Sequence, residues 1–149
     1  MNKLPGMKLG GREIPLYYST YETIAIQEEI GCTAYQLKEV VFGAEKIDEE
    51  LGWEPENMRL TVANDPAKMK KLGTLIRILG NAGLEEEGQA PDLTDKWILR
   101  NMKPGSVLMY AVIVLAVIST GNSMEAKEEN QGPVDEILEE ENAKKQPGS

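Results

Sequence analysis

The 149-residue sequence contains no histidine and only one cysteine, Cys32. Without histidine the chain lacks the commonest general base, metal ligand and pH-responsive group of proteins. Catalysis by Ser-His-Asp or Cys-His arrangements is therefore excluded. A lone cysteine forms neither an internal disulfide nor a cysteine zinc site. We expect no enzyme, no catalytic, cofactor-binding or metal-binding residue, and no cofactor; the low cysteine content favours the cytoplasm.

Long apolar runs and aromatic residues are also scarce. Aromatic residues make up 5% of the chain, so the core must be aliphatic. The longest apolar run, 107–118, has twelve residues, whereas a membrane span needs about 20. We therefore expect this run to form a buried helix covered on most sides, with no membrane partner. The first residues, MNKLPGMKLGG, lack the apolar segment of a signal peptide, which again favours the cytoplasm.

Charge is the main feature that the sequence does have. It contains 25 acidic and 16 basic residues, a net of -9, so no nucleic-acid partner is expected. Residues 122–149 carry a net of -5 (eight acidic, three basic), more than half of that charge. Such a segment buries too little apolar surface to fold alone. The sequence predicts a single globular, mostly helical domain at 1–121 and an acidic, largely flexible tail at 122–149, with a short helix at 133–141.

Local signals predict a hairpin followed by helices. Gly10-Gly11 between two short apolar segments indicates a β-hairpin, with Pro15 placing the second strand at an edge. Capping residues then mark the starts of helices, and glycines mark their ends. The predicted starts are at Ser19 with Glu22, Thr33 with Gln36, Asp65 with Pro66, and either Asp92 or Thr94; the last helix covers roughly 106–120. The predicted ends are at Gly31, Gly43, Gly80 with Gly83, and Gly121.

Residues 44–63 carry weaker signals. Ile47, Leu51 and Trp53 indicate one short helix, 55–57 a loop, and 58–63 an extended or irregular segment. The whole pattern predicts a mainly α fold, α+β in detail, in which the N-terminal hairpin packs on a bundle of about five or six helices. The predicted core contains Ile24, Leu37, Val40, Leu72, Ile76, Leu79, Trp97, Leu108, Val112 and Leu115.

Candidate chemical sites are few. The acidic runs at 28–29, 48–50 and 85–87 match no calcium loop, and adjacent residues on a helix do not face each other, so they indicate solvated surface. Cys32 precedes a predicted helix but has no histidine to pair with, so a small buried residue is expected. The glycine pairs lack the context of a phosphate or dinucleotide site.

Four residues are candidates for binding a partner. Trp53, beside a predicted loop, is a candidate for an exposed contact. Val134, Ile137 and Leu138 fall at helical spacing behind Pro133, as in a tail segment that folds on a partner. The alternative for the tail is a solvated acidic extension. These features indicate an adaptor, a chaperone or an inhibitor.

Several sequence segments resemble the tail assembly chaperones of phages and prophages of Gram-positive bacteria. They are GREIPLYYSTYE at 11–22, IQEEIG at 26–31, LIRILGNAGLE at 75–85, PDLTDKW at 91–97 and KP at 103–104. The likeness covers roughly residues 7–120.

The resemblance implies that the protein binds the tape measure protein of a long-tailed phage, keeps it soluble and recruits tail tube protein around it, in the host cytoplasm. Many such chaperones also have a longer, frameshifted form. The sequence leaves open whether the protein forms a homo-oligomer. The alternatives are an acidic phage-encoded inhibitor or adaptor of a host protein, and a structural tail or head-completion protein.

Overall fold

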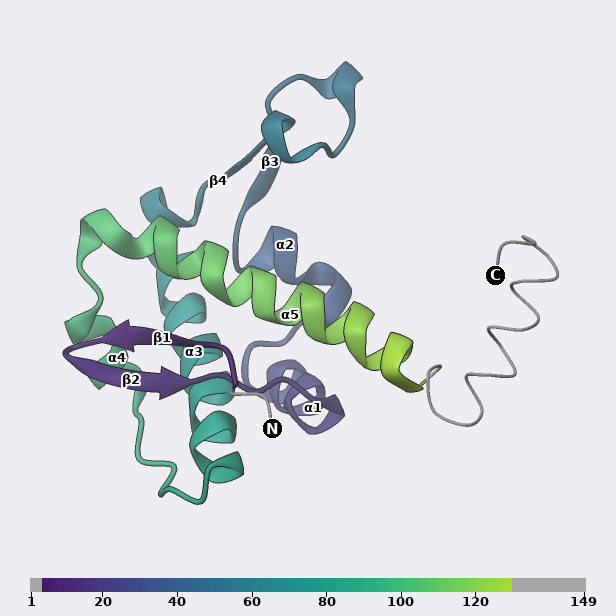
Figure 1. Ribbon diagram of the computed structural model, residues 1–149. Coiled ribbons are helices and arrows are strands. Elements are labelled where there is room, and N and C mark those ends of the chain that lie inside the picture. Colours follow the sequence, from purple (N-terminus) through teal and green to yellow (C-terminus); the bar gives the residue numbers. More distant parts are fainter. Residues whose placement is uncertain (1–3, 130–149) are drawn as a thin grey trace, which may run out of the picture. The chain divides into compact units, whose positions relative to one another are not determined.

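The computed structural model of the chain describes residues 4–129 (Figure 1). The chain divides into two units between residues 117 and 118, and the description below concerns the first. The strands are β1 (Gly6–Leu9), β2 (Arg12–Pro15), β3 (Ala44–Lys46) and β4 (Met58–Leu60). The helices are α1 (Thr20–Glu29), α2 (Leu37–Val40), α3 (Pro66–Glu86), α4 (Asp95–Asn101) and α5 (Val107–Glu129). The predicted mainly α fold with an N-terminal hairpin is confirmed.

Strands β1 and β2 form the hairpin predicted from Gly10-Gly11. Both glycines have positive φ angles, 60° and 77°, which side chains other than glycine rarely adopt. The strands pair antiparallel from Leu9 with Arg12 to Gly6 with Pro15. With only two strands in the sheet, Pro15 lies on an edge strand, as expected.

Three of the predicted helix starts, those of α1, α3 and α4, have side-chain caps, whereas the start predicted at Thr33 leads into a 3-10 helix at Ala34–Gln36. The Tyr21 amide donates to Ser19 Oγ, and the Ser19 amide donates to Glu22 Oε1, which is the expected capping box. At α3, Asp65 Oδ1 accepts from the amides of Ala67 and Lys68. Of the two caps left open for α4, Thr94 is the one used: its hydroxyl accepts from the Trp97 amide at 3.1 Å.

Helix α3 lies at the centre of the first unit, where it contacts α1, α4 and β2. Its apolar side chains repeat every three or four residues and are buried, as amphipathic periodicity predicts. The largest fully buried side chains come from this helix and from the segments around it: Phe42, Leu9, Ile14, Leu16, Ile26, Leu37, Leu72, Leu75, Ile76, Leu79, Leu84 and Ile98.

Part of the predicted core is wrong. Ile24, Leu108 and Val112 are exposed, because α1 and α5 each turn only one side toward the rest of the unit. Val40, Trp97 and Leu115 are half-buried. The predicted core residues that are fully buried are Leu37, Leu72, Ile76 and Leu79.

The helix ends predicted at Gly80, Gly83 and Gly121 are also wrong. Helix α3 continues to Glu86, and α5 continues to Glu129. Gly80 and Gly83 are instead places of close packing: a Cβ atom at Gly83 would lie 2.1 Å from the Pro15 carbonyl oxygen. Gly83 therefore lets the end of β2 lie directly against the helix, and Gly80 leaves room for the side chains of Leu93 and Ile14.

The short helix predicted from Ile47, Leu51 and Trp53 is reduced to one 3-10 turn at Glu49–Leu51, which lies within a second antiparallel hairpin. Strands β3 and β4 pair from Ala44 with Leu60 to Lys46 with Met58, and the extended segment expected after residue 57 begins with β4. Between them the chain forms short 3-10 turns at Glu49–Leu51 and Pro55–Asn57. The spacing of Ile47, Leu51 and Trp53 does not keep one face over successive helical turns, which is why the helix does not extend beyond one turn.

Candidate partner-binding surfaces

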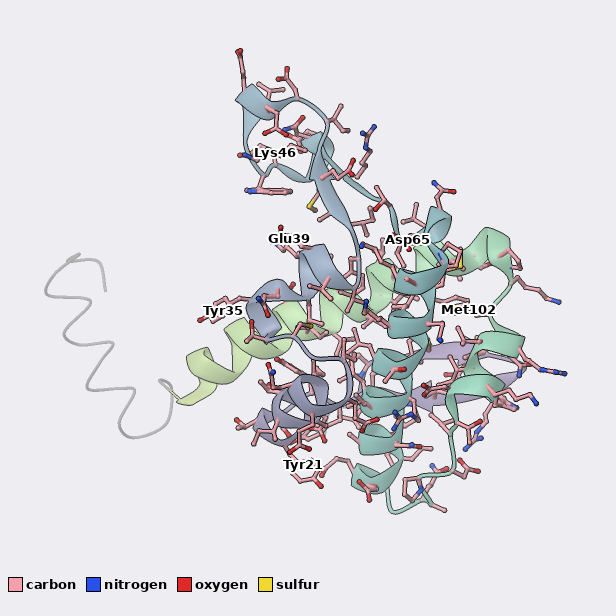
Figure 2. The ribbon with its side chains drawn as sticks, turned by 180° about the vertical axis from the view of Figure 1, so that it is seen from behind. Tyr21, Tyr35, Glu39, Lys46, Asp65 and Met102 are labelled. Carbon is pink, nitrogen blue, oxygen red and sulfur yellow. The ribbon has the colours of Figure 1, made fainter. Side chains whose placement is uncertain are left out.

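Large apolar side chains are exposed at three places on the first unit. Exposed apolar residues occurring singly are common in soluble proteins, but contiguous groups mark binding surfaces. Here they lie on the β3–β4 hairpin, on α5 and on α1, while Tyr35 lies by itself on the 3-10 turn that follows α1, apart from Tyr21 (Figure 2). They are Ile47, Leu51 and Trp53; Leu108, Met109 and Val112; and Tyr21, Ile24 and Tyr35.

The first group lies on what we call the arm, residues 44–60, which comprises β3, β4 and the loop between them. The arm projects away from α2 and α3 (Figure 1), and its side chains around Lys46 stand clear of the helices (Figure 2). Ile47, Leu51 and Trp53 are 52 to 61% exposed. The arm is thus an extension whose apolar side chains form no core of their own.

One buried side chain, that of Asn57, organises the arm loop. Its amide nitrogen donates to the carbonyls of Asp48 at 2.9 Å and Gly52 at 2.6 Å, and its Oδ1 accepts from the Asp48 amide at 2.8 Å. The Asn57 carbonyl accepts from the Ile47 amide at 2.7 Å. Asn57 therefore ties both ends of the loop together while the apolar side chains face solvent.

The arm is also acidic. Residues 45–59 contain six acidic and two basic residues. Both basic side chains are engaged within the arm: Arg59 pairs with Glu45 at 3.0 Å, and the Lys46 ammonium lies 5.1 Å from the centre of the Trp53 ring. A shallow hollow between them is lined by Ala44, Glu45, Lys46, Glu49, Trp53 and Arg59.

The second group forms an apolar stripe on α5. Leu108, Met109 and Val112, spaced one and three residues apart, are 44 to 53% exposed. The opposite side of the same helical turns is buried at Val107, Ala111 and Val114, and the Tyr110 hydroxyl donates to the Lys8 carbonyl of β1 at 3.0 Å. Helix α5 is thus held on one side and open on the other.

The expectation that the apolar run is covered on most sides is therefore wrong. Residues Pro104–Gly121 are long and apolar enough to cross a membrane by length and composition, with a mean hydropathy of 1.8, and 28% of them are buried. A single helix of this length and composition is weak evidence for a membrane span, because mostly buried core helices of soluble proteins share these features. Helix α5 has a buried side at Val107, Ala111 and Val114 and an exposed apolar side at the stripe. This is the pattern of a helix that packs on a domain and leaves one of its own apolar faces uncovered.

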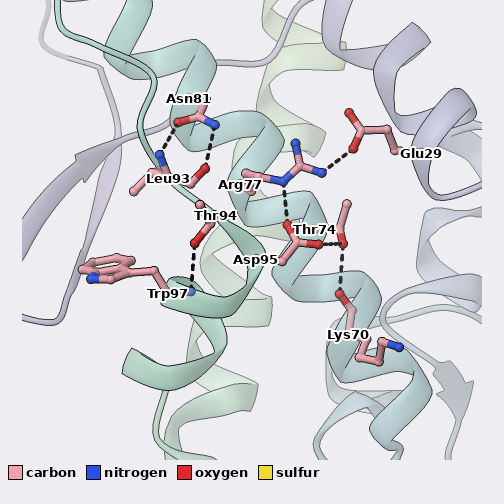
Figure 3. Close-up of polar contacts among 9 residues, drawn as sticks. All are labelled: Glu29, Lys70, Thr74, Arg77, Asn81, Leu93, Thr94, Asp95 and Trp97. Atoms are coloured by element: carbon pink, nitrogen blue, oxygen red, sulfur yellow. Dashed lines mark hydrogen bonds and ion pairs between the residues drawn. The ribbon is translucent and has the colours of Figure 1, made fainter.

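A polar cluster joins three helices (Figure 3). Arg77 of α3 donates through Nε to Asp95 of α4 at 2.5 Å and pairs with Glu29 of α1. The Thr74 hydroxyl donates to the other Asp95 oxygen at 2.6 Å. Hydrogen bonds to Glu29 and then to Asp95 raise the pKa of the Arg77 guanidinium above its ordinary value. The cluster is paired within itself and holds helices together, so it has the character of a structural network.

A neighbouring contact also serves packing. The Asn81 side chain of α3 binds both backbone groups of Leu93: it accepts from the Leu93 amide at 2.9 Å and donates to the Leu93 carbonyl at 3.2 Å (Figure 3). This clamp fixes the segment that leads into α4.

Residues able to hold a metal do not gather within 4–129: no group of three or more cysteine and acidic side chains is found there. Cys32 is buried, and burial raises the pKa of its thiol above the ordinary value while Lys71 opposes the shift. A buried thiol with a raised pKa is a poor nucleophile, which fits the expected role as a small buried residue.

Of the four predicted partner-binding residues, Trp53 lies on the exposed arm. Val134, Ile137 and Leu138, with the helix expected at 133–141, lie outside the described residues. The sequence analysis did not identify Ile47 and Leu51 of the arm, or the apolar stripe on α5, as candidates for binding a partner. Ile47 and Leu51 could have been found as two apolar residues among the carboxylates of 45–56. The stripe on α5 could not, because the 107–118 run is apolar throughout and nothing in it marks the exposed side of the helix.

Comparison of the chain with protein-family models, curated proteins and solved structures finds no match.

Proposed function

We propose that this protein is a tail assembly chaperone of a long-tailed phage, one that binds the tape measure protein, keeps it soluble and helps to recruit tail tube subunits. Support comes from the segments at 7–120 that resemble this family and from the open apolar stripe on α5. The stripe is the observation that carries the proposal.

A chaperone for a long helical protein needs an apolar face that accepts another helix. Leu108 and Val112 are four residues apart and lie on the same side of α5, which is the spacing by which one helix packs along another. Burying the remaining exposed area of a leucine-sized side chain contributes about 1 kcal/mol. Three such side chains give a modest contact, so a long partner would be held by many chaperone copies together.

The test is co-expression with the tape measure protein of the same locus, followed by size-exclusion chromatography. We expect the tape measure protein to stay soluble and to co-elute with the wild-type chain. The double variant Leu108→Ser/Val112→Ser should lose both effects, because it removes two apolar side chains of the stripe. Both positions are exposed, so the substitutions should leave the core intact. Tyr35→Ser is the matched control, since Tyr35 is 96% exposed, stands singly on the turn after α1 and is not part of the α5 stripe.

Three outcomes would count against the proposal. The tape measure protein could stay insoluble with both this chain and any longer frameshifted form. The α5 variant could solubilise it as well as the wild type does, which would remove the stripe from the mechanism. Finally, purified virions could contain this protein, which would indicate a structural tail or head-completion protein instead.

A further inference from the structure

The net charge of the chain is confined to two places. Residues 45–59 of the arm have a net of -4 (six acidic, two basic), and residues 122–149 have a net of -5, which together equal the total of -9. The other 106 residues are therefore neutral as a whole. Within the first unit, the arm is where negative charge is concentrated, and it is also where Ile47, Leu51 and Trp53 are exposed.

We propose that the arm is a docking site for a segment of a partner protein that combines apolar side chains with lysine or arginine. The site differs from the α5 stripe in position and chemistry, so it does not depend on the function proposed above. Leu51 and Ile47 would contact the apolar side chains of the segment, and the Trp53 ring with the surrounding carboxylates would bind its cations.

The hollow beside Trp53 already holds cations of the chain itself. Lys46 occupies the cation–π position over the indole, and Arg59 pairs with Glu45. Glu49 lines the same hollow. An aromatic face bordered by carboxylates is the environment that favours a lysine or arginine side chain. A partner cation would therefore replace or join an arrangement that the arm already stabilises.

The hydrogen bonds of Asn57 reduce the cost of binding at this site. They hold the loop in one conformation before any partner arrives, so little loop entropy is lost on docking. Exposed apolar anchors on a preorganised loop that also carries many charged side chains have the composition of a binding hot spot with a polar rim.

Charge also distinguishes between occupants of the arm. A nucleic acid would be repelled by a net charge of -4. A second copy of this chain could offer Lys96 and Arg100 of α4 and Lys103 after it. The residues outside the arm and tail are neutral as a whole, however, so a second copy attracts the arm less than a basic segment does. The partner that fits best is thus a basic, apolar segment of another protein.

The test uses the full-length chain and a short fluorescein-labelled peptide with a leucine face flanked by lysines, followed by fluorescence anisotropy. We expect the peptide to bind, and the same peptide with glutamate for lysine not to bind. Leu51→Ser/Trp53→Ser should weaken binding about tenfold or more. Glu45→Gln/Glu49→Gln, which removes charge and keeps the apolar anchors, should also weaken it.

Matched controls separate the arm from the other surfaces. Leu108→Ser/Val112→Ser alters the α5 stripe and Tyr35→Ser alters an exposed aromatic residue elsewhere; both should bind the peptide like the wild type. All variants keep the acidic tail, so equal binding by every variant would place the peptide on that tail and overturn the proposal. Thermal unfolding of each variant verifies that the exposed substitutions leave the fold intact.

Self-association gives the second decisive readout. If light scattering shows a concentration-dependent oligomer that Leu51→Ser/Trp53→Ser abolishes, the arm binds a second copy and the proposed occupant is wrong. If that variant and the wild type have the same mass while only the wild type binds the lysine peptide, the proposal stands.

Discussion

Replacement of Gly83 by alanine should destabilise the protein, although alanine normally stabilises a helix interior. In an exposed helix the change from glycine to alanine gains about 1 kcal/mol. At Gly83 the new Cβ atom would lie 2.1 Å from the Pro15 carbonyl oxygen and 2.4 Å from the Pro15 carbonyl carbon. Ordinary contact begins at 3.4 Å, so β2 would have to move by more than 1 Å.

The contacts around β2 resist this shift, and they determine how much stability the substitution costs. The contacted atoms belong to the backbone of β2, and the following segment is tied down by hydrogen bonds from the Leu16 amide to the Pro5 carbonyl at 2.8 Å and from the Tyr17 amide to the Leu79 carbonyl at 3.1 Å. Overpacking costs about 1 to 3 kcal/mol, and loss of the bond to α3 costs about 1 kcal/mol more. After the gain in helix propensity, we expect Gly83→Ala to lower the free energy of unfolding by about 2 kcal/mol.

Urea denaturation followed by circular dichroism measures this change. Gly105→Ala is the matched control, because a Cβ atom there meets nothing within 4 Å and its φ is not positive. The control should change stability by less than about 0.5 kcal/mol. If Gly83→Ala stabilises the protein by the ordinary helix increment, β2 does not lie against α3 and the packing described here is refuted.

Three further predictions concern single side chains. Asn81→Ala should cost about 2 kcal/mol in urea unfolding, because both backbone groups of Leu93 lose their partner; an unchanged midpoint would show that the clamp contributes nothing. Cys32 should react with a thiol reagent at pH 8 only when urea unfolds the chain, so rapid labelling of the folded protein would contradict its burial and raised pKa. The hydrogen bond from the Lys68 backbone amide lowers the pKa of the Asp65 carboxyl. The charged carboxylate therefore stabilises α3 at any pH above the ordinary pKa of about 4, and this stabilisation is lost as the pH falls through the lowered pKa. The Tm advantage of the wild type over Asp65→Asn should therefore shrink below about pH 4, and a constant difference would be evidence against it.

The parts of the fold that follow from local chemistry could be predicted from the sequence. The Gly10-Gly11 turn and the caps at Ser19 and Asp65 depend on residues within three positions of each other, and the structure contains all of them. Gly83 could not be predicted in the same way. Its role depends on Pro15, nearly seventy residues earlier, and a glycine required by a distant neighbour looks in sequence like a helix end.

The candidate site shows the same division. Trp53 could be singled out because it stands beside turn residues and carboxylates. The arm that carries it could not, since strands of three residues give too little alternation to identify and Asn57, which orders the loop, acts through backbone groups five and nine positions away. For α5 the helix itself can be predicted from the apolar run, but the side that is buried cannot, because it depends on packing against the rest of the unit.

The two surfaces can be told apart by salt, because one is charged and the other is not. Residues 107–117 of α5 contain no charged side chain, whereas the arm has a net of -4. Binding to α5 would arise from apolar burial and should be unchanged or strengthened at high salt. Binding to the arm should weaken as salt rises from about 0.1 to about 1 M, where the Debye length falls from about 10 to about 3 Å. A tape measure complex that dissociates at high salt while Leu108→Ser/Val112→Ser still binds would place that partner on the arm and remove α5 from the proposed mechanism.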